Sequence, residues 1–298
     1  MGSISETDVP SSVQVDTPAK MHTHDLFNLR ERTIIVTGGV GALGLETARA
    51  IMECGGDVIA IDCIESAPVA PWENLQKLAV SCSSKLWYYQ CDITDPDHTN
   101  AVFQSAASQA RYPLRGLVAC AGICTLGPSV DFSIPEMKRI IDVNLVGTMV
   151  CAQAAARIIA KQHSDRPASM VFIASMSGYV VNRGLYSTAY NSSKAGVHQL
   201  TRNLASEYGG GNPDGFNAQG WTGPQIRVNS ISPGYIKTRM TEPLLADPTQ
   251  KGLMVGGSML GRVSTPDEYR GPVIFLLSDA SSYMTGGDLL VDGGHTRW

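Results

Sequence analysis

The segment from Ala174 to Lys194, which reads ASMSGYVVNRGLYSTAYNSSK, gathers many hydroxyl side chains between an apolar run and a predicted helix. Within it, Tyr190 and Lys194 are four residues apart, so on a helix both side chains share one face. An ammonium group beside a phenol favours the phenolate and lowers its pKa from about 10. Such a tyrosine can exchange a proton near neutral pH, as hydride transfer between a nicotinamide and a carbonyl requires. Alone, the same spacing also fits a plain surface pair.

Two further tyrosines in this segment are weaker candidates for proton transfer. Tyr186 has another tyrosine, not a cation, four residues on. Tyr179 is followed at that spacing by Arg183, but two valines and a glycine disfavour a helix there, and arginine does not titrate near neutral pH. We therefore predict Tyr190 as the acid/base, and Tyr179 and Tyr186 as walls of a substrate pocket.

A glycine-rich turn follows the first predicted strand, in the sequence TGGVGALG. Gly39, Gly41 and Gly44 give the pattern G-x-G-x-x-G between a strand and a helix. Glycines at this spacing allow a tight turn and let backbone N–H groups approach a pyrophosphate at the helix N-terminus. We also predict that the neighbouring residues Gly38 and Leu43 contact the cofactor. Without a ligand, the pattern would be a tight connection only.

Two aspartates follow predicted strands on the same side of the sheet. Asp62 stands 18 residues after Gly44, where a carboxylate can accept hydrogen bonds from an adenosine ribose. It would repel a 2′-phosphate, and residues 60–66 contain no arginine or lysine, so NAD(H) is favoured and NADP(H) stays open. Asp92 could face the adenine edge or cap the following helix.

Short apolar runs alternate with helical patterns along the chain. The runs lie at 33–39, 57–62, 86–93, 114–122, 168–175, 226–234 and 288–294, and helices are expected near 43–56, 73–82, 96–110, 133–162, 187–208 and 265–279. This alternation predicts an α/β fold with a parallel sheet covered on both faces. We expect a flexible extension at 1–28 and one domain over 29–298, with an insertion at 209–225 and a substrate flap at 237–261.

Composition narrows the classes of partner. The chain has 298 residues, 43% of them hydrophobic, and a net charge of −4 without a basic block, which argues against nucleic acid. No apolar run approaches the 18 or so residues of a membrane span, and no membrane partner is expected. Seven cysteines, an odd number, lie partly in apolar runs, which indicates a reducing, cytoplasmic location. No set of side chains has zinc spacing, so no metal is expected.

Six features in one order carry a resemblance: TGGVGALG, Asp62, Asn144 within NLVG, Ser175, YNSSK and SPGYIKT. Over about 28–298 the chain resembles the short-chain dehydrogenase/reductase family. The resemblance implies a single Rossmann-type doubly wound sheet of seven strands in the order 3-2-1-4-5-6-7. It implies that Tyr190 is the catalytic acid/base, that Lys194 lowers its pKa and binds the nicotinamide ribose, and that Asn144 helps to hold a water. The further implied cofactor contacts are Ala121, Gly122, Pro233, Gly234, Ile236 and Thr238.

The family's substrate-positioning serine has two candidates here. Ser175 ends the strand directly and fits the pattern S-x-x-G, whereas Ser177 lies 13 residues before Tyr190, which is the more usual separation. We favour Ser175 as catalytic and keep Ser177 as its rival and as a substrate contact. The chain departs from the family at Ala42, where a glycine is usual, and at residues 119–122, where ACAG replaces NNAG.

The predicted activity is NAD(P)(H)-dependent interconversion of a secondary alcohol and a ketone. A catalytically silent dinucleotide-binding regulator, and an isomerase or dehydratase on the same scaffold, are the alternatives. The substrate stays open: ASMSG resembles fungal polyol and ketose reductases of the family, whereas leucines and methionines in 237–261 suit a lipid, polyketide or terpenoid alcohol. By resemblance, a homodimer or homotetramer is expected.

Overall fold

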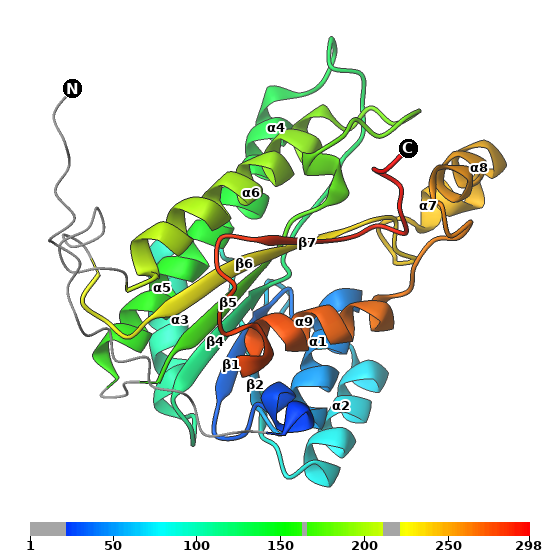
Figure 1. Cartoon of the computed structure of the whole chain (residues 1–298). Helices are drawn as coiled ribbons and strands as arrows, with labels where there is room; N and C mark the ends of the chain where they lie inside the picture. The colour runs from blue at the N-terminus through cyan, green and yellow to red at the C-terminus, as the bar shows by residue number, and fades with distance from the viewer. Residues whose placement is uncertain (1–21, 163–165, 211–220) are drawn as a thin grey trace, which may run out of the picture.

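A parallel sheet of seven strands runs through the protein (Figure 1). The computed structural model describes residues 22–162, 166–210 and 221–298. The strand order is β3-β2-β1-β4-β5-β6-β7, and all six neighbouring pairs are parallel, as predicted. The strands are β1 (Thr33–Thr37), β2 (Asp57–Asp62), β3 (Leu86–Gln90), β4 (Leu114–Ala119), β5 (Ala168–Ile173), β6 (Ile226–Pro233) and β7 (Asp288–Val291). Most of the predicted extension lies outside the described residues.

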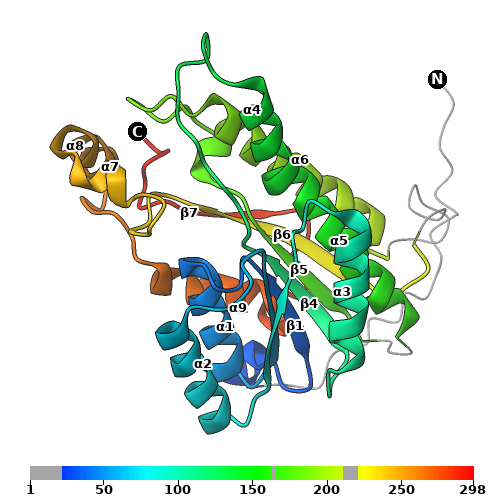
Figure 2. The ribbon, with the colours of Figure 1, turned by 180° about the vertical axis from the view of Figure 1, so that it is seen from behind.

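Four helices cover one face of the sheet (Figures 1 and 2). They are α3 (Pro96–Ser108), α4 (Ile134–Ile141), α5 (Gly147–Lys161) and α6 (Thr188–Tyr208). Their apolar side chains, such as Phe103 and Val197, join the sheet residues Ile35, Leu117 and Phe172 in one buried cluster. Because both faces of a parallel sheet are buried, its strands are apolar throughout rather than alternating.

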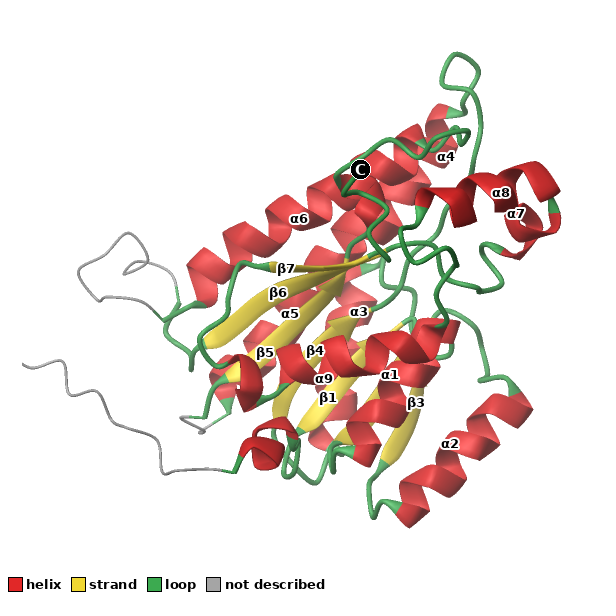
Figure 3. Ribbon diagram, turned by 45° about the vertical axis from the view of Figure 1, so that its right-hand side comes forward, coloured by secondary structure: helices red, strands yellow, loops and turns green. Residues whose placement is uncertain are grey.

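Three helices cover the opposite face: α1 (Ala42–Glu53), α2 (Val69–Ser81) and α9 (Arg270–Leu277) (Figure 3). Ile51 of α1 and Leu277 of α9 share a second buried cluster with Ile34, Val118 and Val171 of the strands. The predicted helix at 265–279 is divided, since the 3-10 turn η4 (Pro266–Tyr269) precedes α9. Further 3-10 turns are η1 (Thr23–Phe27), η3 (Met176–Gly178) and η5 (Asp279–Ser281).

Helix starts follow local capping chemistry. Asp95 caps α3 by accepting a hydrogen bond from the backbone N–H of His98. Ser133 caps α4 in the same way, through the N–H of Glu136. Ser133 and Glu136 have the spacing of a capping box, but its reciprocal half is missing, because the Glu136 carboxylate binds Thr125 and Arg139 instead. These caps fix where each helix leaves the sheet.

One helical segment, Ile134–Lys161, is long and apolar enough to cross a membrane by length and composition. The expectation that no run approaches that length is therefore wrong. Yet 56% of its apolar window is buried inside the protein, and α5 contacts α3 and β4. Its apolar character is accounted for by packing against the sheet.

The predicted flap contains two short helices, α7 (Glu242–Ala246) and α8 (Pro248–Gly257), beyond the carboxyl end of β6 (Figure 1). Asp247 caps α8 through the N–H groups of Thr249 and Gln250. Of the predicted insertion, residues 211–220 lie outside the described residues. After them, Trp221 packs on Tyr208 with ring centroids 4.9 Å apart.

Candidate active site

The glycine turn joins β1 to the N-terminus of α1, and its backbone leaves no room for side chains. Gly38 has φ +61°, and a Cβ there would lie 2.7 Å from the backbone nitrogen of Ala121. A Cβ on Gly44 would lie 2.1 Å from the carbonyl oxygen of Gly38. Gly41 immediately precedes the first turn of α1, where backbone N–H groups are unpaired within the helix. This cradle fits a pyrophosphate group.

Asp62, at the end of β2, lies beside this turn. Its carboxylate accepts hydrogen bonds from the backbone N–H of Val40 at 3.3 Å and of Cys63 at 2.9 Å. The glycine turn and the carboxylate are therefore held together, as a ribose-binding site needs.

Asp92 caps no helix, because Asp95 fills that position. The Asp92 carboxylate instead accepts bonds from the N–H and hydroxyl of Thr94, at 3.0 and 2.8 Å. The helix-cap alternative for Asp92 is therefore wrong, and an adenine contact remains a prediction. The sequence alone does not distinguish the two, because Asp92 and Asp95 both stand shortly before the helical pattern.

A cavity of about 490 Å³ runs from the glycine turn to Tyr190 at the carboxyl edge of the sheet. Of the predicted site residues, its lining includes Gly38, Gly41, Leu43, Gly44, Gly122, Ser175, Ser177, Tyr190, Lys194, Pro233, Gly234, Ile236 and Thr238. Segments far apart in the chain therefore meet at one edge, where open α/β sheets bind ligands.

Tyr190 and Lys194 share one face of α6, as predicted. The Lys194 ammonium is 5.7 Å from the centre of the Tyr190 ring and donates to the carbonyl oxygen of Ile173 at 2.7 Å. Lys194 is only 4% exposed, and burial lowers its pKa to about 8. Cys120 and Cys124 oppose this shift.

The expected lowering of the Tyr190 pKa by Lys194 is not found. Burial raises the pKa of Tyr190 to about 12, and a hydrogen bond with the Ser175 hydroxyl partly opposes the rise. Desolvation of the phenolate outweighs the neighbouring cation, because Lys194 is itself desolvated and hydrogen-bonded elsewhere. The phenol is therefore protonated at neutral pH.

Ser175 and Ser177 differ in their contacts. Both are buried and line the cavity. Ser175 lies between the end of β5 and the turn η3, and its hydroxyl accepts a hydrogen bond from the N–H of Ser177 at 3.1 Å. Ser175 is also the serine whose hydroxyl partly opposes the raised pKa of the Tyr190 phenol. The choice of Ser175 over Ser177 stays a prediction.

Asn144 lies on a π-helical turn, η2 (Asp142–Val146), between α4 and α5. It is fully buried. Its side-chain oxygen accepts from the N–H of Ile123 at 2.8 Å, and its amide donates to the Ile123 carbonyl and the Ser193 hydroxyl, each at 3.0 Å. Single π-turns within α-helices are frequent at functional sites. Asn144 therefore fastens the loop after β4 to α6, next to Lys194.

Two predicted substrate contacts lie outside the cavity lining. Tyr179 is 50% exposed, and its ring stacks on His198 with centroids 4.1 Å apart. Tyr186 is 67% exposed. Neither tyrosine is in the cavity lining, although Leu185 and Ser187 on either side of Tyr186 are, and contact of the two tyrosines with a substrate stays a prediction.

Other residues that the sequence interpretation did not single out line the cavity in their place. The polar ones include Asn182, Ser187, Tyr235, Arg239 and Thr241, and the apolar ones include Leu126, Leu185, Met240 and Leu244. Tyr235 lies within SPGYIKT, so its position beside the predicted contacts was a usable signal. Asn182 had no such signal, because only the fold of the 179–187 loop turns it inward.

A doubly wound sheet with a glycine turn, and with a tyrosine, a lysine and a serine lining one cavity at the carboxyl ends of its strands, is typical of a Rossmann-type oxidoreductase. Comparison with known proteins gives the family. A family model described as enoyl-(acyl carrier protein) reductase matches residues 39–296. A short-chain dehydrogenase/reductase of Aspergillus versicolor is 45% identical, with 92% of this chain and 90% of that protein covered.

Two further similarities agree. The NADH-dependent L-xylulose reductase of Ambrosiozyma monospora is 35% identical, over 91% of this chain and 97% of that protein. The crystal structure of the NADPH-dependent 3-quinuclidinone reductase of Rhodotorula rubra has a TM-score of 0.81 at 30% identity, covering 95% of this chain and 98% of that one. The chain belongs to the short-chain dehydrogenase/reductase family and is an oxidoreductase acting on CH–OH groups.

Proposed function

We propose that the enzyme interconverts a secondary alcohol and a ketone with Tyr190 as the proton donor and acceptor. The observation that carries this proposal is that Ser175, Tyr190 and Lys194 line one cavity, with the Ser175 hydroxyl near enough to the Tyr190 phenol to lower its pKa. A carbonyl oxygen placed between these hydroxyls receives two hydrogen bonds. When bound, a nicotinamide dinucleotide would supply or accept the hydride at the carbonyl carbon.

Each remaining residue has a role in this proposal. The glycine turn and the N-terminus of α1 hold the pyrophosphate, and Asp62 holds the adenosine ribose. The buried Lys194 presents its ammonium to the nicotinamide ribose. Asn144 positions Lys194 and a proton-relay water. Ile236 and Thr238 flank the nicotinamide, since both line the cavity next to Pro233 and Gly234.

NAD(H) is the proposed cofactor, because the Asp62 carboxylate lies at the turn and would repel a 2′-phosphate. One similar protein is named NADH-dependent and another NADPH-dependent. The choice of NAD(H) therefore rests on the Asp62 carboxylate. A fluorescence titration should show at least about tenfold tighter binding of NADH than of NADPH. Tighter NADPH binding would overturn this choice.

Tyr190→Phe tests the catalytic proposal. We expect a fall in turnover of about 10²- to 10⁴-fold, because the variant keeps the ring and removes the transferable proton. NADH affinity should stay within about twofold of wild type. Tyr186→Phe is the matched control, since this exposed tyrosine does not line the cavity. Full activity in Tyr190→Phe would refute the assignment. If the wild-type protein binds the cofactor but turns over no compound in a broad panel of carbonyls, a catalytically silent regulator is favoured.

For the substrate, we propose a ketone or alcohol with at least one further hydroxyl group, as in ketoses and polyols. Tyr235 accepts a hydrogen bond from the Asn182 amide at 3.1 Å, and Asn182 in turn accepts one from Ser187 at 3.4 Å. The Tyr235 proton has no acceptor among the described residues, although the side chain lines the cavity. The half-buried Tyr235 hydroxyl can therefore donate a hydrogen bond to a substrate hydroxyl within the cavity.

A pair of substrates tests this choice. Tyr235→Phe should lower kcat/KM for L-xylulose by about tenfold or more and leave 2-pentanone nearly unchanged, because only the ketose has a hydroxyl to lose. Equal losses for both would mean that Tyr235 has a general structural role. A wild-type preference for 2-pentanone would instead favour the apolar-substrate reading of the flap.

Location and assembly complete the proposal. All seven cysteines are free thiols, and Cys91 and Cys151 are buried, which suits a reducing compartment such as the cytoplasm. β7 is an edge strand, and the nearby Tyr283 is fully exposed. An uncovered sheet edge supports a homodimer or homotetramer formed through this side.

A further inference from the structure

A second cavity, of about 830 Å³, lies at the opposite edge of the sheet from the glycine turn. Its lining comes from the segments that precede β1, β2, β3, β4 and β5 and from the turn after α9. Ligands of the reaction bind at the carboxyl ends of the strands, so this amino-edge cavity is separate from the active site. We call it the arginine cleft, after Arg30, Arg32, Arg111, Arg115 and Arg166, which line it.

The charge of the arginine cleft is opposite to that of the chain. Five guanidinium groups line it, against the two carboxylates of Glu31 and Asp279. Asp57, buried behind the lining, binds Arg111 through two hydrogen bonds of 2.7 and 2.9 Å. Because the whole chain has a net charge of −4, the excess of positive charge here is local.

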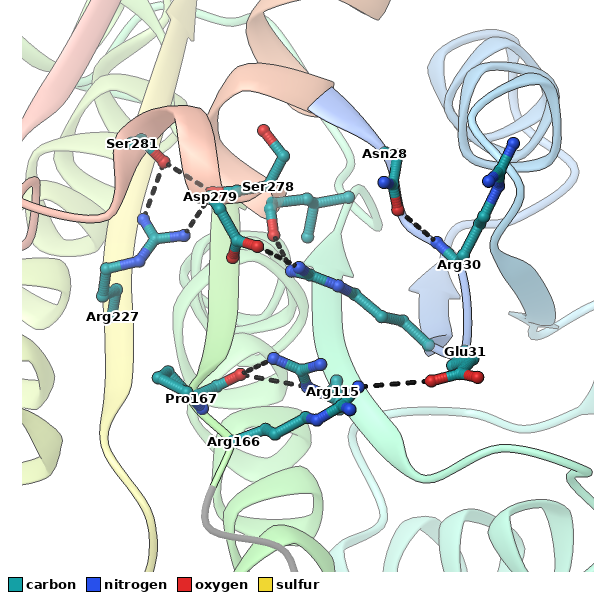
Figure 4. A network of polar contacts seen from close by, with 12 residues as sticks. Asn28, Arg30, Glu31, Arg115, Arg166, Pro167, Arg227, Ser278, Asp279 and Ser281 are labelled. Atoms are coloured by element: carbon teal, nitrogen blue, oxygen red, sulfur yellow. Dashed lines mark hydrogen bonds and ion pairs between the residues drawn. The ribbon is translucent and has the colours of Figure 1, made fainter. Parts of the chain in front are cut away.

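Two of these cations are almost fully buried, and Figure 4 shows one of them, Arg115, beside Pro167. Arg115 is 6% exposed, and its Nε and Nη2 atoms donate to the Pro167 carbonyl at 3.1 and 2.6 Å. Arg32 is 7% exposed and pairs with Asp279 at 2.7 Å, while its buried Nε has no partner. Burial, together with the charge of Arg32, lowers the pKa of Arg115 to about 10. Neighbouring buried cations are costly unless an anion is present.

The rim of the arginine cleft holds exposed charges of both signs. Arg166 pairs with Glu31 at 3.2 Å, and both side chains are exposed. The backbone of Arg30 is fixed by the Asn28 side chain at 3.1 Å, and its guanidinium has no partner among the described residues (Figure 4). A guanidinium group presents a planar fork that matches phosphate oxygens.

We propose that the arginine cleft binds a small phosphate-bearing anion, with Arg30 and Arg166 contacting it at the rim and Arg115 and Arg32 supplying buried positive charge. Phosphate fits better than a single carboxylate, because several guanidinium groups can share its oxygens. This site is independent of the proposed reaction, and its test needs no turnover.

Titration calorimetry with pyrophosphate tests the proposal. Wild-type protein should bind saturably, and Arg30→Gln should weaken the affinity by about fivefold or more. Glu31→Gln should act in the opposite direction and tighten binding, because it removes the rim anion. Arg202→Gln, an equal loss of charge on the exposed surface of α6, is the matched control and should change the affinity by less than about twofold.

These variants also locate the binding. The glycine turn can accept pyrophosphate, but Arg30 and Glu31 lie at the other edge of the sheet, so binding there would leave both variants like the wild type. Unchanged affinity in both variants would therefore overturn the proposal. So would the absence of saturable binding heat in the wild type, or tighter binding of citrate than of pyrophosphate. Thermal unfolding of each variant confirms that it is folded, and the exposed positions of Arg30 and Glu31 make this outcome expected.

Discussion

Tyr190 and Lys194 show how burial controls two groups on one helix face. Desolvation raises the pKa of the phenol to about 12 and lowers that of the ammonium to about 8. Both shifts favour the neutral form, as expected where water is excluded. The protonated Tyr190 suits the donation of a proton to a carbonyl oxygen, and the reverse reaction requires higher pH.

Lys194 should make stability depend on pH. Its folded pKa of about 8 lies below the ordinary 10.5, so between these values the unfolded chain binds more protons. The free energy of unfolding should therefore rise with pH from about 8 to 10.5, relative to Lys194→Met, by roughly 3 kcal/mol. Denaturant unfolding of both proteins across this range measures the difference.

The exposed Lys251 provides the control for this measurement. Lys251→Met should show no such change, because an exposed ammonium has the same surroundings in both states. A constant difference between wild type and Lys194→Met over the same pH range would show that Lys194 is not desolvated in solution.

At the scale of elements, two connections position the residues of the site. They are the glycine turn between β1 and α1 and the π-turn before α5. The first brings the helix N-terminus to the cavity, and the second holds Asn144 beside Ser193 of α6. In both connections a shift of the backbone would break contacts, because main-chain atoms and buried side chains are closely packed there.

Alanine substitutions at two glycines distinguish the lack of space in the glycine turn from the general effect of glycine on helix stability. Gly44→Ala should destabilise the protein by about 2 kcal/mol or more, because its Cβ would meet the Gly38 carbonyl oxygen at 2.1 Å. NADH affinity should fall with it. Gly252→Ala, in α8, meets no atom within 4 Å and should stabilise by roughly 0.5–1 kcal/mol.

Denaturant unfolding and NADH fluorescence measure both effects of these glycine substitutions. A Gly44→Ala protein with wild-type stability and cofactor affinity would show that the turn can widen without cost. That outcome would remove the cradle argument for a pyrophosphate at α1.

At the scale of the whole molecule, buried arginines tie the last part of the chain to the sheet. Arg227 of β6 is 6% exposed. Its guanidinium donates to the Ser281 hydroxyl and to the carbonyl groups of Leu276, Ser278 and Met284, at 2.8 to 3.3 Å. Figure 4 shows Arg227 beside Ser278 and Ser281. One planar group therefore joins β6 to the end of α9 and the approach to β7.

Arg227→Lys should destabilise the protein by about 3 kcal/mol, because a lysine cannot make these four hydrogen bonds at once and its ammonium would be buried with fewer partners. Equilibrium unfolding in guanidinium chloride measures this loss. Arg202→Lys, on the exposed side of α6, should change stability by less than about 0.5 kcal/mol. Equal stability of the two variants would argue against Arg227 as an anchor.

Local patterns were enough for several features of this enzyme. The alternation of apolar runs and helical segments predicts the parallel sheet, and the i, i+4 spacing places Tyr190 and Lys194 on one face. The glycine spacing predicts the tight turn into α1. Each of these depends on interactions within a few residues or on one repeated burial pattern, so the sequence contains the information directly.

Only the tertiary structure decided which side chains meet. It places Asp95 rather than Asp92 at the start of α3, turns Tyr179 onto His198, and brings Asn182 to Tyr235, 53 residues away. It also reverses the expected pKa shift of Tyr190, because desolvation depends on everything that surrounds the ring. The arginines of the cleft, scattered from residue 30 to 166, become neighbours because loops that precede parallel strands share one edge of the sheet.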